Sequence, residues 1–268
     1  DHVQIVMPET GLPSSRVEIE GGQKGLYDTG VRLKIQGREI PVTIPEKVAL
    51  TTGTEKVHQS EISPKQIEAL AQGWQELQKG VAIVNGDYDS SRGTAGGLRH
   101  MVEIHAQPIT NPAHLIDPDT GKVKQASQFP RTLNETQVLE LTQGTMQNVE
   151  SATVARHGSL MLVANIPENL SHLTPGVDQV QIIINPSDGI VTFMPIRGEG
   201  IVRAALVHKD KIPKGGFEIQ EGKRGPKIHR LLARGDELND TTNLVVVQVE
   251  ADGRHFVRMG GSPQLTND

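Results

Sequence analysis

Residues 180–195 read VQIIINPSDGIVTFMP, the clearest fold signal in the chain. Two β-prone runs, 180–185 and 190–195, flank a segment whose Asp-Gly pair is typical of a tight hairpin turn. Outward from this hairpin, residues 31–36 alternate apolar with charged side chains, as a half-buried strand does. Other segments with strand character are 3–7, 16–20, 39–44, 81–84, 153–166 and 244–249. A chain with this many short strands is expected to be β-rich.

Two helices are expected among the strands. Residues 64–79 open with Ser63 as the N-cap and Pro64 in the first position, and their apolar side chains recur at helical spacing. A second helix is expected from about 134 to 146. Two pairs could form its capping box, Thr132 with Glu135 or Asn134 with Gln137. Strands and helices together predict the α+β class.

The composition of the chain excludes several kinds of chemistry and partner. The 268 residues include no cysteine, which rules out disulfides, a thiol nucleophile and cysteine-ligated zinc. The net charge of −5 argues against broad nucleic-acid binding, so DNA is not expected as a partner. Residues 209–234 nevertheless carry eight Lys/Arg against three Asp/Glu, a local charge of +5. This stretch is either a solvated basic hairpin or a surface that contacts phosphates. No apolar run approaches the roughly eighteen residues that span a bilayer, so no membrane contact is expected.

The segment Gly96-Gly97-Leu98-Arg99-His100 suggests a site, because paired glycines let the backbone pass close to another group. We expect a strand over 98–107. Its pleat would place His100 on an apolar face, as a core or a catalytic histidine, and His105 on a charged, solvated face.

Other chemistry is not indicated. The two histidines lack the glutamate of the helical zinc pattern, and the acidic turns at 87–89 and 117–121 do not continue as calcium loops. There is no phosphate-binding glycine loop, dinucleotide fingerprint or nucleophile elbow. The expectation is that neither a metal nor a cofactor is used.

Residues 81–196 combine several short motifs in a distinctive order. They are Asn85-Gly86-Asp87 after a strand, Ala95-Gly96-Gly97-Leu98-Arg99-His100, Gly121-Lys122-Val123-Lys124 running into Gln128-Phe129-Pro130, a helix, and the hairpin ending in Thr192-Phe193-Met194-Pro195. In this order they resemble the EndoU-type uridylate-specific endoribonucleases, which include bacterial toxins and nidoviral enzymes.

The resemblance implies a fold and a chemistry. The fold would be an EndoU-like central domain at 61–197 with two antiparallel sheets and two main helices, flanked by β-rich segments at 1–60 and 198–268. Members cleave RNA without a metal, to 2′,3′-cyclic phosphates, with two histidines and a lysine. By position, His100 would be a general acid or base and Lys124 or Lys122 would stabilise the phosphorane. Substrate contacts would come from Thr192, Phe193 and Gly97.

Two positions depart from the family pattern. Asn85 stands where the first histidine is expected, and Met194 stands where the family has a base-stacking tyrosine. Asparagine cannot act as a base, so the missing base would come from elsewhere, for instance His105 or His114, or the domain would be a non-cleaving member.

The leading hypothesis is a secreted bacterial toxin or effector that cleaves RNA, with a cognate immunity protein or a host protein as a further partner. The first alternative is a catalytically degenerate module of the same fold that binds protein or RNA. A third is ADP-ribosyl transfer, which needs a late Glu-x-Glu; the one such triplet here, Glu18-Ile19-Glu20, lies early in the chain.

Overall fold

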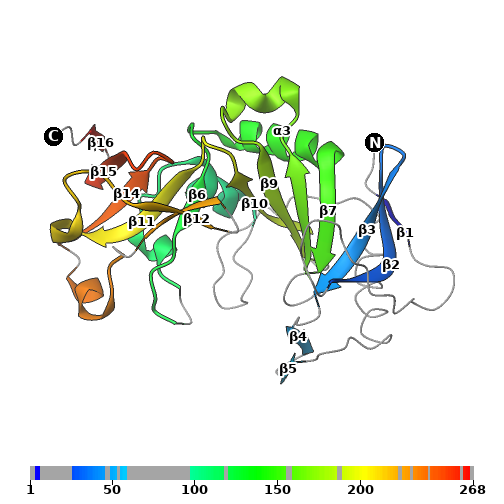
Figure 1. The fold of residues 1–268 in the computed structure, drawn as a ribbon, viewed down its shortest axis with the longest axis horizontal. Helices are drawn as coiled ribbons and strands as arrows, with labels where there is room; N and C mark the ends of the chain where they lie inside the picture. Colours follow the sequence, from blue (N-terminus) through cyan, green and yellow to red (C-terminus); the bar gives the residue numbers. More distant parts are fainter. Residues whose placement is uncertain are drawn as a thin grey trace.

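The computed structural model describes most of the C-terminal two thirds of the chain and parts of the first third (Figure 1). The described residues are 4–6, 26–45, 49–52, 55–58, 97–117, 120–154, 159–185, 189–222, 225–229, 232–240, 242–259 and 262–265. The expected strands at 16–20 and 81–84, the helix at 64–79 and Asn85 lie outside these residues.

A seven-stranded sheet forms one half of the structure (Figure 1). In spatial order its strands are β1 (Gln4–Val6), β2 (Leu26–Ile35), β3 (Arg38–Pro45), β7 (Val149–Val154), β8 (Leu160–Asn165), β9 (Gln179–Asn185) and β10 (Gly189–Arg197). All neighbours are antiparallel except β3 and β7, which run parallel. The hairpin expected from residues 180–195 is confirmed as β9 and β10, and the segment with strand character at 153–166 contains the end of β7 and all of β8.

A five-stranded antiparallel sheet forms the other half. Its order is β16 (Ser262–Leu265), β15 (His255–Met259), β14 (Leu244–Val249), β11 (Val202–His208) and β6 (Ala126–Gln128). The other strands among the described residues form two small hairpins, β4 (Ala49–Thr52) with β5 (Glu55–His58) and β12 (Ile219–Gly222) with β13 (Gly225–Ile228). The pairs β3–β7 and β6–β11 cross the expected domain boundaries after residues 60 and 197. The α+β, strand-rich class is confirmed.

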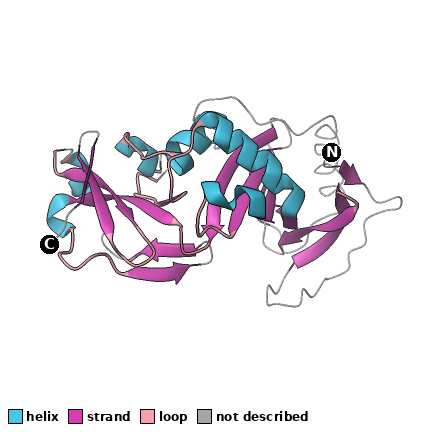
Figure 2. Cartoon of the chain, turned by 90° about the horizontal axis from the view of Figure 1, so that it is seen from above, coloured by secondary structure: helices cyan, strands magenta, loops and turns pink. Residues whose placement is uncertain are grey.

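Among the described residues the helices are short apart from α3 (Glu135–Thr145), which lies across the strands of the seven-stranded sheet (Figure 2). Its capping box is the Asn134–Gln137 pair, with both reciprocal bonds formed at 2.9 and 3.0 Å. The remaining helical segments are α2 (Leu98–His100), η3 (Met101–Ala106), η4 (Pro112–Leu115), η5 (Met146–Asn148), η7 (Glu168–Leu173), η8 (Lys209–Lys211) and η9 (Gly235–Asn239). No helix among the described residues has the length and apolar character to cross a membrane.

The five-stranded sheet is buried on both faces. Along β11, Ala205 and Val207 belong to one hydrophobic cluster, while Ala204 and Leu206 belong to another. The second cluster also contains Ile104 of η3, so this segment is packed against the sheet. The first residues of the same segment belong to the large core beside α3 and the seven-stranded sheet. Residues 98–106 therefore lie where the two halves of the molecule meet.

The strand expected at 98–107 is wrong: this segment is the helix α2 followed by η3, a π-helix. Its core residues Leu98, Met101, Val102 and Ala106 recur at spacings of three and four, which is helical. Arg99 and Glu103 form an i,i+4 ion pair at 2.8 Å on the exposed side. The charged residues that resembled one face of a strand are the solvated side of this helix.

Candidate active site

The candidate site begins at Gly97, which anchors the start of α2 to β10. The backbone N–H of Gly97 donates to the Val191 carbonyl at 2.8 Å, directly before Thr192. Gly97 has φ 107° and ψ 172°, a conformation that residues with a Cβ avoid. Glycine is therefore required here, and its role is to fix the position of α2 rather than to give the chain freedom.

The π-helical turn brings His100 and His105 together. Their ring centroids are 5.3 Å apart and the ring planes meet at 78°. In an α-helix, residues five apart point about 140° away from each other, because each residue turns the chain by about 100°. The i→i+5 bonding of a π-helix widens the turn, so such residues stack on the same side. The site depends on this rare local geometry.

His105 is tied to β6. Its Nδ1 lies 2.6 Å from the Ser127 carbonyl oxygen, which can only accept, so Nδ1 carries the proton and Nε2 is the basic nitrogen. Phe129 N–H donates to the His105 carbonyl at 2.8 Å, and Leu133 N–H donates to the Ala106 carbonyl at 2.8 Å. These bonds satisfy carbonyls at the end of η3. The helix, and with it the imidazole pair, is held against β6.

Lys124 reaches the histidines from a short hairpin. Ile116 and Val123 form an isolated antiparallel bridge, and Lys124 N–H donates to the Leu115 carbonyl at 2.8 Å. The half-buried Lys124 is close enough for its charge to lower the pKa of both His100 and His105. Lys122 is exposed in the turn of the same hairpin. Of the two candidate lysines, Lys124 is the one whose charge acts on both imidazoles.

Both imidazoles are neutral at neutral pH. Burial, reinforced by the charges of His105, Lys124 and His114, lowers the pKa of His100 to about 3. Burial also lowers the pKa of His105 to about 4; the bond to Ser127 opposes this effect, and the charges of Arg203 and Lys124 add to it. His105 is only 5% exposed, so its expected solvated position is wrong. At neutral pH both imidazoles can therefore accept a proton. Only a small fraction of the molecules carries an imidazolium that can donate one.

His114 borders the cluster on its exposed side. Its Nε2 lies 4.0 Å from a carboxylate oxygen of Glu103, and the side chain is partly buried. Arg99 binds the other oxygen of that carboxylate. His114 therefore belongs to the charged edge of the site rather than to the imidazole pair.

The expected base-contacting residues lie on β10, which packs against η3. Thr192 is 7% exposed and Phe193 is fully buried. The Phe193 ring stacks on Phe129, with centroids 5.5 Å apart and planes at 28°. Phe193 is a core residue, so it is not placed to stack on a substrate base. Met194, on the other face of the strand, is partly buried.

Arg203 was not singled out from the sequence. It lies on β11 opposite Ser127 and is 6% exposed. Its charge lowers the pKa of His105, so it belongs to the electrostatic surroundings of the site. The sequence did contain a signal for Arg203. It is an arginine on the same face of the strand as Ala205 and Val207, which point into the core.

Within the described residues, no group of three or more His, Asp or Glu side chains is placed to hold a metal ion. No family model, curated protein or solved structure matches the chain.

Proposed function

We propose that the protein is a metal-independent endoribonuclease of the EndoU type, acting as a secreted bacterial toxin or effector on RNA. The observation that supports this proposal is the meeting of His100, His105 and Lys124 in one cluster beside the Gly97–Val191 contact. His100 and Lys124 come from two separate sequence motifs of the resemblance, and His105 lies outside those motifs. Two imidazoles and an ammonium are the groups that transfer protons and stabilise charge at a phosphodiester.

The hydrogen bond from His105 Nδ1 to the Ser127 carbonyl favours the imidazolium form, so His105 is assigned the role of the acid and His100 that of the base. Burial keeps His100 neutral above about pH 3, so it accepts the proton of the ribose 2′-hydroxyl. The 2′-oxygen then bonds to phosphorus and the bond to the 5′-oxygen breaks, which gives the 2′,3′-cyclic phosphate. His105 takes up a proton first, and its imidazolium gives that proton to the leaving 5′-oxygen. The Lys124 ammonium stabilises the negative charge on the phosphorane.

This assignment predicts an acidic pH dependence. The required imidazolium becomes rarer by about tenfold for each pH unit above the His105 pKa of about 4. kcat/KM, which reports the free enzyme, should therefore rise as the pH is lowered from about 7 to about 4.

The test is incubation with a uridine-containing oligonucleotide in the presence of a chelator, followed by detection of cyclic phosphate ends. His100→Gln should lower the rate by at least about 100-fold, the lower range for general acid–base catalysis. Lys124→Gln should also be impaired, while the matched variant Lys122→Gln, on the same hairpin but exposed, should retain activity. Absence of product at every pH would refute the proposal, as would equal activity of the Lys124 and Lys122 variants.

A second candidate is a non-catalytic binding module of the same fold. The observation that favours it is the depth of the two histidines, which are neutral and, for His105, bonded to a core strand. This alternative predicts that His100→Ala leaves partner binding and biological effect unchanged. The binding module would use the basic stretch at 209–234. In that stretch, Lys211 is paired with Glu237 at 2.6 Å, and Lys209 donates to the Thr242 carbonyl.

A further inference from the structure

A cavity lies on one face of the five-stranded sheet, beyond the end of an apolar cluster. Along β14, Val246 is buried in that cluster, whereas Gln248 and the following Glu250 line a cavity of about 260 Å³. Val202 of β11 pairs with Gln128 of β6, so these two side chains share the same face and line the cavity as well. The face thus changes from aliphatic to amide side chains where the cavity opens.

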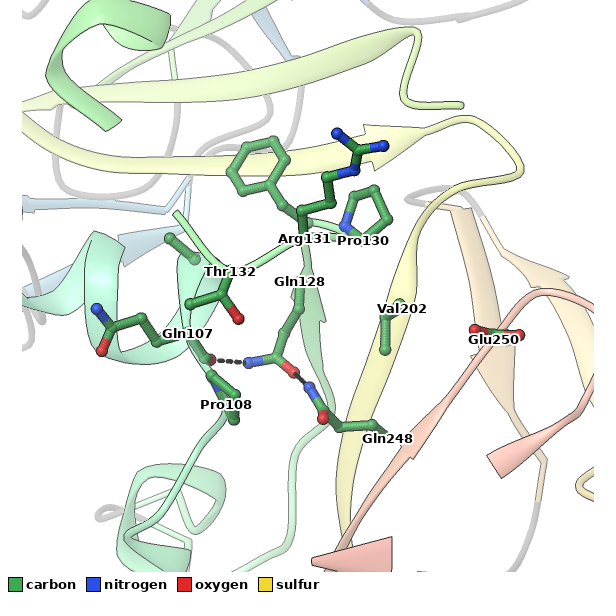
Figure 3. Close-up of a pocket in the computed structure, with 11 residues that line it drawn as sticks. Gln107, Pro108, Gln128, Pro130, Arg131, Thr132, Val202, Gln248 and Glu250 are labelled. Atoms are coloured by element: carbon green, nitrogen blue, oxygen red, sulfur yellow. Dashed lines mark hydrogen bonds between the residues drawn. The ribbon is translucent and has the colours of Figure 1, made fainter. Parts of the chain in front are cut away.

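Two glutamines form a fixed floor (Figure 3). Gln128 is 1% exposed, and its Nε2 donates to the carbonyls of Ile104 and Gln107 at 3.0 and 2.6 Å. Its Oε1 accepts from Gln248 Nε2 at 2.5 Å. A buried amide is costly unless it is hydrogen-bonded, and these bonds also set which way each amide points. The floor is therefore preorganised, with known donor and acceptor directions.

The walls are apolar and the rim carries one charge of each sign. Pro108, Pro130 and Val202 supply compact apolar surfaces around the opening (Figure 3). Arg131 follows β6, and its Nη1 donates to the His172 carbonyl at 3.1 Å. On the β14 side, Glu250 pairs with Arg254 at 2.7 Å. Arg131 and Glu250 thus offer the cavity a donor and an acceptor, each held in place by a partner outside it.

We propose that this cavity binds a guanine base. Guanine presents O6 and N7 as neighbouring acceptors, which a guanidinium such as that of Arg131 recognises with two hydrogen bonds. Its N1–H and N2–H groups are neighbouring donors, which the Glu250 carboxylate can accept. Adenine offers an amine in place of O6 and no N1–H, so it would meet Arg131 donor to donor and leave Glu250 unsatisfied.

The volume and the apolar walls of the cavity favour a single planar base. Drug-sized ligands occupy cavities of roughly 300–1,000 Å³, so a cavity of about 260 Å³ takes one base rather than a dinucleotide. A zwitterionic amino acid would also match the two rim charges, but it would not use the apolar surfaces of Pro108, Pro130 and Val202. Binding of the base at this cavity does not require RNA cleavage, because binding is measured without turnover.

The test is isothermal titration calorimetry of the full chain with GMP, AMP, CMP, UMP and L-glutamine. GMP should bind at least about tenfold more tightly than AMP. Arg131→Ala and Glu250→Gln should each weaken GMP by about tenfold or more. The matched controls Arg197→Ala and Glu140→Gln, which are exposed and do not line the cavity, should bind as the unaltered chain does. Circular dichroism checks that each variant is folded.

Three results would overturn the proposal: no GMP binding at millimolar concentration, equal binding of all four nucleotides, or binding of glutamine but not GMP. An oligouridine with one guanosine distinguishes the two sources of the base. Tighter binding of this strand than of GMP identifies a guanine within RNA, and tighter binding of GMP identifies a free nucleotide.

Discussion

The buried imidazole pair should make the protein unusually sensitive to mild acid. In the unfolded chain, His100 and His105 take up protons near pH 6.5, whereas in the folded protein they do so only at about pH 3 and about pH 4. Between these values the unfolded state binds more protons. The free energy of unfolding therefore falls as the pH is lowered through about 6.5, and the loss ends only near the folded pKa values.

The size of the effect follows from the same pKa values. One pKa unit corresponds to about 1.4 kcal/mol. Lowering the pH from about 7 to about 5 should cost about 2 kcal/mol for each histidine, and about 4 kcal/mol for the pair. Domains are typically stable by only about 5–15 kcal/mol, so this is a large fraction of the total.

Urea unfolding at about pH 7 and about pH 5 measures this loss in the free energy of unfolding directly. Carboxylates contribute little to the difference, because they titrate mainly below about pH 5. The double variant His100→Gln/His105→Asn removes both titrating groups, and the asparagine can still donate to the Ser127 carbonyl. It should lose no more than about 1 kcal/mol between the two pH values. His172→Asn, at an exposed position, is the control and should behave as the unaltered chain does. The reasoning is refuted if the double variant keeps the full pH dependence.

Three further changes test the packing around the site by chemical denaturation. Gly200→Ala should destabilise the protein, because a Cβ there would press against the backbone oxygen of Pro175. The control Gly215→Ala, with nothing within 4 Å of its Cβ, should be tolerated. Equal stabilities of the two variants would contradict this prediction. Asn134→Ala should cost about 1 kcal/mol by removing the N-cap of α3, and no change would mean the cap is dispensable. Gln128→Leu should cost about 1–3 kcal/mol for each carbonyl left without its donor; an unchanged midpoint would show that water replaces the amide.

Local signals predicted several individual strands, one hairpin and one helix. The hairpin β9–β10 follows from β-prone runs on either side of an Asp-Gly turn, and β14 from an uninterrupted valine-rich run. The helix α3 follows from apolar spacing and its capping box. In each case, residues near one another in the chain carry the information, so the sequence is sufficient.

The site shows where local signals end. His100, His105 and Lys124 were recognised as candidates, but residues 98–107 have apolar side chains compatible with both a strand and a helix. Packing between β6 and β10 decides for a helix, because that places Leu98, Met101, Val102 and Ala106 in one core. The rare π-turn that sets the two imidazoles edge to face is also a product of that packing.

By itself, the sequence determined the class of the fold, its best-defined hairpin and helix, and the residue types available for chemistry. Only the tertiary structure decided which of these residues meet. Arg203 became part of the site through the pairing of β11 with β6, and Gln128 met Gln248 across 120 residues of chain. Such contacts depend on burial and strand register between distant segments, and neither can be read from neighbouring residues.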